Sequence, residues 1–189
     1  ELYVDRMTAV EGNTFFYAIP TEERVREWAE VMPDDFRVCP KLHREITHQG
    51  PLLPNKAKAA TFIQRLKPFG AHLGPFHLQL PPSYGPDYAD DLRRFLRAWP
   101  RSKGPIAVEV RHPGWFDSPR FERFGEMLRE LGVAQVLLDS RPVHESSDDP
   151  QVHSNRQKPQ LPLLPRRRTD FVVVRYICHP DLERNAPYL

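Results

Sequence analysis

The sequence has 189 residues, of which 40% are hydrophobic and 28% charged, and its formal net charge is +2. This is a globular composition, and a single domain over residues 1–189 is the simplest prediction. The small net charge excludes a strong field for steering toward nucleic acid or an anionic membrane. No apolar run approaches the roughly 18 residues of a membrane span, no leader pattern opens the sequence at Glu1, and Cys39 and Cys178 lack metal-ligand spacing. We therefore expect a soluble protein of the reducing cytoplasm with no membrane partner.

Short apolar or β-branched segments alternate with amphipathic helical patterns along the chain. Strands are predicted over residues 9–17, 36–41, 72–80, 106–111, 133–139 and 171–177. Thr21 is the predicted N-cap of the first helix, in which Val25, Trp28, Ala29 and Met32 form an apolar stripe. Further stripes lie within residues 59–69, 88–99 and 121–131. We assign all four stripes to core packing.

Alternation of strands and helices predicts a parallel sheet, because each strand must return through a crossover to run beside the last. A polar residue lies at or near the carboxyl end of each predicted strand, and successive members of this set are 30 to 38 residues apart: Glu11, Lys41, Gln79, Glu109, Asp139 and Arg175. In a (β/α) barrel such positions converge on the mouth where active sites are built. No GxGxxG or Walker loop follows the first strand, so the barrel is favoured over an open doubly wound sheet.

Several motifs occur in an order that resembles one known family. They include VEGNTFFYAIP (residues 10–20), DDFRVCPKLHREITH (34–48), LGPFHLQLPPSYGP (73–86), VEVRHPGWF (108–116), LLDSRPVH (137–144), KPQLP (158–162) and VRYICHP (174–180). The sequence is similar to the YecE-like family, domain of unknown function 72, over nearly its whole length. This resemblance implies a TIM barrel, in agreement with the spacing of the polar residues, and implies no particular activity.

Such proteins have a strand before the first helix and continue beyond the seventh strand. The present sequence opens on ELYVDRM, which reads as the tail of the first helix, and ends on NAPYL, so strands two to seven of a (β/α)8 barrel are visible. A TIM barrel typically takes about 250 residues. We expect the chain to be a fragment that is poorly soluble or molten when made alone, because its two outer strands would have open edges.

Charged residues on the predicted strands are the strongest functional signal. Glu109 and Arg111 are two residues apart, so both side chains lie on the same face of their strand. One hydrophobic core would have to bury an unusually large number of charged side chains, each at a cost in desolvation: the acidic members Glu11, Glu109 and Asp139 and the basic members Lys41, Arg111 and Arg175. A polar pocket is the favoured interpretation. The alternative is a structural ion pair of Arg111 with Glu109, or with Glu11 or Asp139 across the barrel.

Each residue of this candidate pocket has a predicted role. Glu11 and Glu109 are the candidate acid/base groups, and Asp139 completes the catalytic set by orienting the substrate. Lys41, Arg111 and Arg175 are expected to hold a phosphate or carboxylate. The full substrate-binding set is Asn13, Lys41, His48, Gln79, Arg111, His112, Trp115 and Arg175.

Three residues of the pocket region have competing interpretations. Trp115 is either a stacking platform for a sugar or base or a packing residue over the adjacent helix. His48 and His112, with His179, follow strand ends and could join carboxylates around a metal, but no HExxH motif occurs and the nearby cations oppose it. No metal is therefore predicted, and no cofactor is indicated.

Residues 141–170 form a long connection without clear helical periodicity. It follows Asp139 directly, so a lid that brings His144 toward the pocket is one interpretation and an insertion turned to solvent is the other. Arg166, Arg167 and Arg168 read as a solvated basic rim.

The favoured function is binding of an anionic or polar small ligand at the carboxyl face of the barrel, with a hydrolase or lyase reaction that uses carboxylate acid/base catalysis. The alternatives are a nucleic-acid-associated module that reads phosphates and a noncatalytic scaffold. The sequence does not decide whether the protein is an enzyme, and it does not indicate the oligomeric state.

Overall fold

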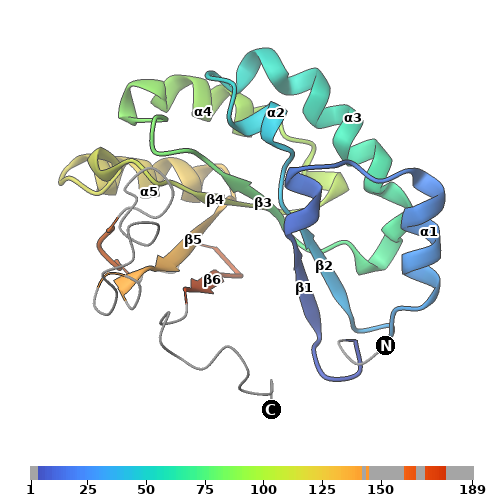
Figure 1. Cartoon of the computed structure of the whole chain (residues 1–189). Helices are drawn as coiled ribbons and strands as arrows, with labels where there is room; N and C mark the ends of the chain where they lie inside the picture. Colours follow the sequence, from blue (N-terminus) through green and yellow to red (C-terminus); the bar gives the residue numbers. More distant parts are fainter. Residues whose placement is uncertain (1–3, 142–143, 145–159, 165–168, 178–189) are drawn as a thin grey trace. The chain divides into compact units, whose positions relative to one another are not determined.

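The computed structural model describes residues 4–141, 144, 160–164 and 169–177 (Figure 1). The chain divides into two compact units. The first comprises Glu1–Gln79 and Asp90–Val108, and the second comprises Leu80–Ala89 and Glu109–Leu189. The prediction of a single domain over residues 1–189 stays a prediction.

The first unit is built on consecutive strands that lie side by side. Strands β1 (Ala9–Gly12) and β2 (Arg37–Pro40) are parallel, with Glu11 opposite Cys39. Strand β3 (Phe76–Gln79) follows β2 through parallel bridges, one of which joins Lys41 to His77. Strand β4 (Ile106–Glu109) is the next neighbour of β3. The parallel pairing of β1 and β2 confirms the prediction from strand and helix alternation.

Helices of the first unit cover the apolar face of these strands. They are α1 (Glu22–Glu30), α2 (Arg44–Thr47), α3 (Lys56–Leu66) and α4 (Ala89–Arg97). The predicted N-cap of α1 is confirmed, since the Thr21 side chain accepts a hydrogen bond from the Arg24 N–H at 3.3 Å. The ring of Phe76 on β3 packs against Phe62 of α3 and against Trp99, with centroid distances of 6.3 and 5.1 Å. The helical stripes therefore serve packing, as predicted.

All six strands are shorter than their predicted segments, and β1 and β3 differ most, for local reasons. Strand β1 ends at Gly12, and the 3-10 helix η1 (Asn13–Phe16) turns Phe15 into the core against Trp28 at a centroid distance of 6.1 Å. A side chain at Gly12 would collide with the Phe15 ring, so the turn depends on glycine there. Strand β3 begins only at Phe76, after η3 (Lys67–His72), because Pro75 has no N–H to donate.

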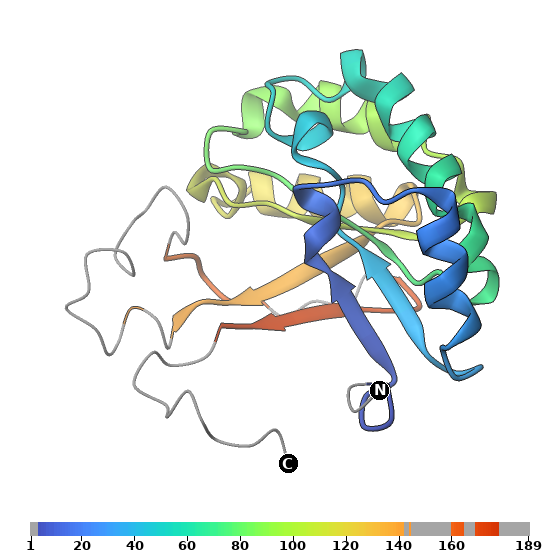
Figure 2. The same cartoon turned by 45° about the vertical axis from the view of Figure 1, so that its right-hand side comes forward.

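The second unit contains α5 (Arg120–Glu130), β5 (Ala134–Asp139) and β6 (Val173–Tyr176). Strands β5 and β6 are parallel, with Leu138 opposite Arg175, and Figure 2 shows them running side by side. Before α5, the 3-10 helix η6 (Pro113–Trp115) packs Trp115 against Phe124 at a centroid distance of 5.0 Å. Most of the predicted lid, residues 141–170, lies outside the described residues.

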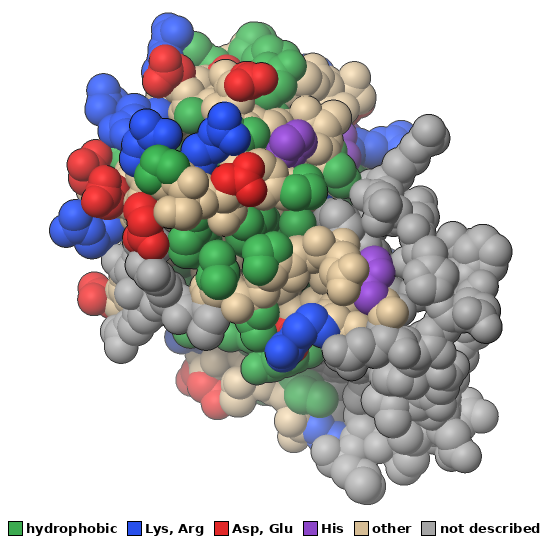
Figure 3. Space-filling model, turned by 90° about the vertical axis from the view of Figure 1, so that its left-hand side faces the viewer, with side chains coloured by type: hydrophobic (Ala, Val, Ile, Leu, Met, Phe, Trp, Pro, Cys, Tyr) green, Lys and Arg blue, Asp and Glu red, His purple; other side chains and the backbone are tan. Residues whose placement is uncertain are grey.

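Among the described residues, none of the helices is both long and apolar enough to span a membrane. On the face drawn in Figure 3, basic and acidic side chains of the described residues lie next to one another. That face therefore has no broad single-signed patch.

Candidate functional site

Glu109, at the end of β4, is the centre of an ion cluster within the second unit. Its side chain is fully buried, at 0% exposure. One carboxylate oxygen, Oε1, accepts a hydrogen bond from Arg111 Nε at 2.6 Å, and the other, Oε2, accepts one from Arg175 Nη1 at 2.7 Å. Glu109 and Arg111 thus lie on the same face of their strand, as predicted from the alternation of side chains. We call Glu109, Arg111 and Arg175 the arginine cluster.

The arginine cluster places two guanidinium groups around one carboxylate. The guanidinium side chains are only 12% and 21% exposed for Arg111 and Arg175, so solvent screening is weak. Both contacts are short, charge-assisted hydrogen bonds. Within these three residues the charges sum to +1.

Asp139, at the end of β5, is bound by its own neighbour. Its Oδ1 and Oδ2 accept from Arg141 Nε and Nη2 at 2.9 and 2.8 Å, and Oδ1 also accepts from the Arg141 backbone N–H at 3.2 Å. The hydrogen bond from the Arg141 side chain lowers the pKa of Asp139, and the backbone hydrogen bond lowers it further, against an opposing effect of burial. Asp139 is therefore an ionised carboxylate near neutral pH and a poor proton donor.

Arg141 is a site residue that the sequence analysis missed. Its signal is a repeated spacing: an acidic residue at a strand end with arginine two positions later, as in Glu109 with Arg111 and Asp139 with Arg141. In both pairs the arginine Nε donates to the acid that precedes it. In both pairs the strand ends at the acid, and the arginine two residues beyond the strand turns back to the carboxylate.

His112 and Trp115 have local structural contacts in the turn that follows β4. His112 caps η6, because its Nδ1 accepts a hydrogen bond from the Gly114 N–H at 3.0 Å. Trp115 is 2% exposed, and its Nε1–H donates to the Tyr84 carbonyl at 2.8 Å. Of the two interpretations of Trp115, packing describes the structure, because its side chain is almost wholly buried.

In the first unit, Lys41 lies just beyond β2 among aromatic and amide groups. Its side chain is largely buried, its Nζ donates to Asn13 Oδ1 at 3.1 Å, and the ammonium lies 4.4 Å from the centroid of the Phe16 ring. The same ring meets His48 edge-on at 4.8 Å. The structure therefore groups three of the predicted binding residues, Asn13, Lys41 and His48, around Phe16. Their role toward a ligand stays a prediction.

Glu11 and His77 form a second polar group of the first unit. Glu11 Oε1 lies 3.8 Å from Nδ1 of His77, and the histidine is buried while the glutamate is part-exposed. Burial raises the pKa of the neighbouring Cys39 thiol, and the negative charge of Glu11 raises it further. Cys39 is therefore not an activated nucleophile. His77 was missed by the sequence analysis, although it shares the Gln79 face of β3 by alternation.

Two buried glutamine side chains have an oxygen without a hydrogen-bond partner among the described residues. They are Gln79 on β3, which was predicted to orient a ligand, and Gln135 on β5, which was not singled out. A buried acceptor without a partner costs roughly 1–3 kcal/mol. Such atoms are therefore suited to receive a hydrogen bond from a ligand or an ordered water.

The predicted site residues fall into two sets, one in each unit. Glu11, Lys41 and Gln79 belong to the first unit, whereas Glu109 and Asp139 belong to the second. Convergence of both sets on a single concavity therefore stays a prediction. Within the described residues, the side chains of His, Cys, Asp and Glu form no group that could hold a metal ion. His179, the third of the histidines considered for a metal, lies outside the described residues.

Comparison with known proteins assigns the family. The model of the family described as "Protein of unknown function DUF72" matches residues 1–188. The chain belongs to the DUF72 family. It is 35% identical to UPF0759 protein YecE of Escherichia coli K12 over 188 residues, which are 98% of this chain and 69% of YecE. It is 25% identical to UPF0759 protein YunF of Bacillus subtilis over 155 residues, or 78% of this chain and 54% of YunF.

Solved structures of DUF72 proteins support the fold. A family member from Enterococcus faecalis matches 93% of this chain and 67% of its own length, with a TM-score of 0.65 and 23% identity. A member from Thermotoga maritima matches 92% of this chain and 60% of its own length, with a TM-score of 0.59 and 19% identity. At such identities the likeness shows the fold alone. The α/β fold with parallel strands is therefore confirmed as that of DUF72 proteins, in keeping with a partial TIM-type barrel.

Proposed function

We propose that this DUF72 protein binds a small anionic ligand, through a carboxylate or phosphate group, at the arginine cluster. The observation that supports the proposal is that the fully buried Glu109 holds two guanidiniums at 2.6 and 2.7 Å. A planar guanidinium whose orientation is fixed by a buried carboxylate suits recognition of oxyanions.

Glu109 is a positioning residue in this proposal, although the sequence analysis treated it as an acid/base candidate. Both of its oxygens accept hydrogen bonds from guanidinium groups, so taking up a proton would break one of two charge-assisted contacts inside a buried site. Its role is to fix the two arginines and to offset part of their mutual repulsion.

Acid/base chemistry is assigned to Glu11. Of the three acids predicted as catalytic, Glu109 is bound by two arginines and Asp139 by Arg141, whereas Glu11 is 31% exposed and lies beside His77. A part-exposed carboxylate next to an imidazole can exchange protons with a substrate group. This assignment concerns the first unit alone, and the proposed anion binding at the arginine cluster does not depend on it.

Thermal unfolding in inorganic phosphate tests the anion site. Phosphate should raise the melting temperature above that in sodium chloride of equal ionic strength, because a ligand that binds only the folded state stabilises it by mass action. Arg175→Ala should abolish most of this increase. Arg120→Ala is the matched control, since Arg120 belongs to the same unit and forms an exposed ion pair with Asp117. An increase that survives Arg175→Ala would count against the site.

The nucleic-acid alternative is tested with a different variant, Arg111→Ala. A phosphate-reading module should bind single-stranded oligonucleotides at low salt, with an affinity that falls steeply as salt rises. The small net charge and the mixed charges on the face in Figure 3 favour a small ligand instead. We expect no oligonucleotide binding at low salt, and steep salt-dependent binding lost in Arg111→Ala would support the alternative.

A further inference from the structure

A groove lies in the first unit near the amino ends of β3 and β4, away from the strand ends that carry the candidate site. It has a volume of about 430 Å³, within the range of about 300–1,000 Å³ for small-molecule sites. The residues that line it come from α3, from η3 and from the segment around η5 (Arg101–Lys103): Ala60, Ile63, Gln64, Lys67, Gly70, Leu73, Pro100, Ser102 and Lys103.

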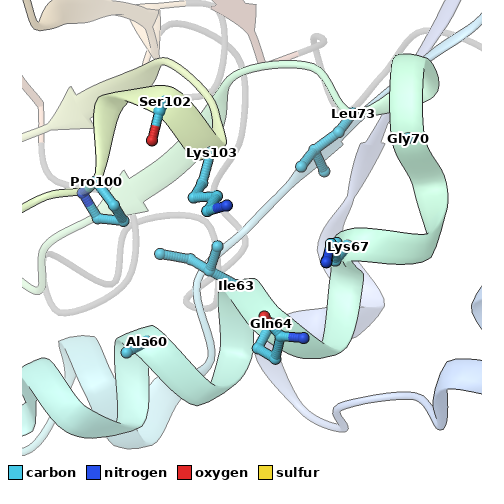
Figure 4. Close-up of a pocket in the computed structure, with 9 residues that line it drawn as sticks. All are labelled: Ala60, Ile63, Gln64, Lys67, Gly70, Leu73, Pro100, Ser102 and Lys103. Atoms are coloured by element: carbon cyan, nitrogen blue, oxygen red, sulfur yellow. The ribbon is translucent and has the colours of Figure 1, made fainter.

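The lining is apolar in its floor and cationic at its rim. Ile63 and Leu73 contribute apolar surface, and Figure 4 shows that Lys103 reaches from η5 toward α3, with Lys67 at the end of that helix. None of the lining residues is acidic. Neither lysine forms an ion pair with another residue in the described part of the chain. The two positive charges are therefore not neutralised by the groove itself.

Gly70 shapes the edge of this groove. Its φ of +54° lies in the left-handed region, where residues with a side chain are strained, and it interrupts the helical turns of η3. The backbone reverses there, so that Leu73 and Lys67 both reach the groove from the same short segment. The local sequence thus fixes the groove through glycine at the turn.

We propose that this groove binds a small amphipathic carboxylate, with the apolar body against Ile63 and Leu73 and the carboxylate between Lys67 and Lys103. An apolar surface with a few convergent polar groups is the usual composition of a ligand site. The absence of acidic residues in the lining selects an anion over a cation, and the apolar floor selects a molecule with a hydrocarbon or aromatic body over a free inorganic anion. This site is separate from the proposed anion site at the arginine cluster.

Octanoate is the probe. The comparison ligands are 1-octanol, which has the hydrocarbon chain without the charge, and acetate, which has the carboxylate without the long chain. In ¹H–¹⁵N NMR titrations, octanoate should shift the amides of Ile63, Gly70 and Ser102 and should bind more tightly than either part. Lys67→Gln with Lys103→Gln should weaken octanoate about fivefold to tenfold, as expected for two exposed ion pairs, and should leave octanol unchanged. Ala60→Glu, which adds a negative charge to an exposed position in the lining, should weaken octanoate independently.

The matched control is Lys56→Gln with Lys58→Gln, which removes two positive charges from α3 outside the groove. It should leave octanoate affinity unchanged. The proposal is overturned if octanol binds as tightly as octanoate, if the control variant weakens octanoate as much as the groove variant does, or if the shifted amides lie elsewhere in the chain. Failure of phosphate to bind the arginine cluster would leave this result unaffected.

Discussion

The contribution of Asp139 to the free energy of unfolding is expected to depend on pH. Its hydrogen bonds from Arg141 lower its pKa in the folded state, whereas an unfolded aspartate titrates near about 3.9. The ionised form therefore stabilises the fold above that pH, and this contribution is lost as the pH falls through the folded-state pKa. We expect Asp139→Asn to reduce the free energy of unfolding at pH 6 and to have progressively less effect below pH of about 4.

Urea unfolding of the wild type and of Asp139→Asn between pH 3 and 6 measures this difference. Asp117→Asn is the control, because Asp117 is exposed and its pair with Arg120 is expected to be worth little. A destabilisation by Asp139→Asn that is the same at pH 3 and pH 6 would show that the carboxylate charge does not stabilise the fold.

Residue types and their alternation predicted polar side chains at the strand ends and, as one alternative, the ion pair of Arg111 with Glu109, but not the other pairs. The common face of Glu109 and Arg111 follows from strand geometry. The contact between Glu109 and Arg175 joins residues 66 positions apart, and local sequence has no signal for it. The burial of Trp115 was one of two interpretations open from the sequence, and the contacts that produce it are with the carbonyl of Tyr84 and a ring of α5.

Among the elements, the start of α3 depends on a carboxylate from α4. Asp91 accepts from the backbone N–H groups of Leu52 and Leu53 at 2.6 and 3.1 Å, just before the turn that leads into α3. Asp91→Ala should lower the free energy of unfolding by about 2 kcal/mol, as expected for hydrogen bonds to a charged group. Asp90→Ala, at an exposed neighbouring position, is the control. Urea unfolding measures both, and equal effects would contradict the anchoring role.

Helical periodicity predicted the four longer helices well, because the apolar stripes of α3, α4 and α5 form their buried faces and that of α1 is buried at Val25. Strand bounds were predicted less well. The segment 9–17 contains a 3-10 turn that tertiary contacts of Phe15 stabilise, and a pattern of β-branched and aromatic residues does not reveal it. The short helix α2 was missed because four residues carry too little periodicity.

At the scale of the whole molecule, one exposed apolar stripe stands out in the second unit. Val174 and Tyr176 alternate along β6, Val172 lies just before it, and Val172, Val174 and Tyr176 are 45%, 41% and 75% exposed. Apolar side chains in a row on a strand favour association between copies. Val174→Thr with Tyr176→Thr should therefore reduce self-association while keeping residues that suit a strand.

Light scattering over a range of protein concentrations measures this effect. Val31→Thr is the control, because Val31 is an exposed apolar residue at the end of α1 and outside the stripe. An apparent mass that rises with concentration equally in the wild type and in the double variant would show that the stripe does not cause association.

The family provides the fold of the whole molecule but not its chemistry. This chain spans 69% of YecE and 67% of the matched Enterococcus faecalis chain. Motif order along the chain predicted the family, because family motifs are local in sequence. The ligand could not be predicted in the same way, since it depends on which buried charges meet, as at the arginine cluster.

Isothermal titration of inorganic phosphate into the purified protein, at fixed ionic strength, tests the central claim most directly. The decisive variant is Glu109→Leu with Arg111→Met and Arg175→Met, because replacing a buried ion cluster by apolar residues often preserves stability. Circular dichroism should show that it folds. If the arginine cluster is the anion site, phosphate should bind the wild type saturably and should not bind the folded variant. Equal binding by the two proteins, or no binding by the wild type, would contradict it.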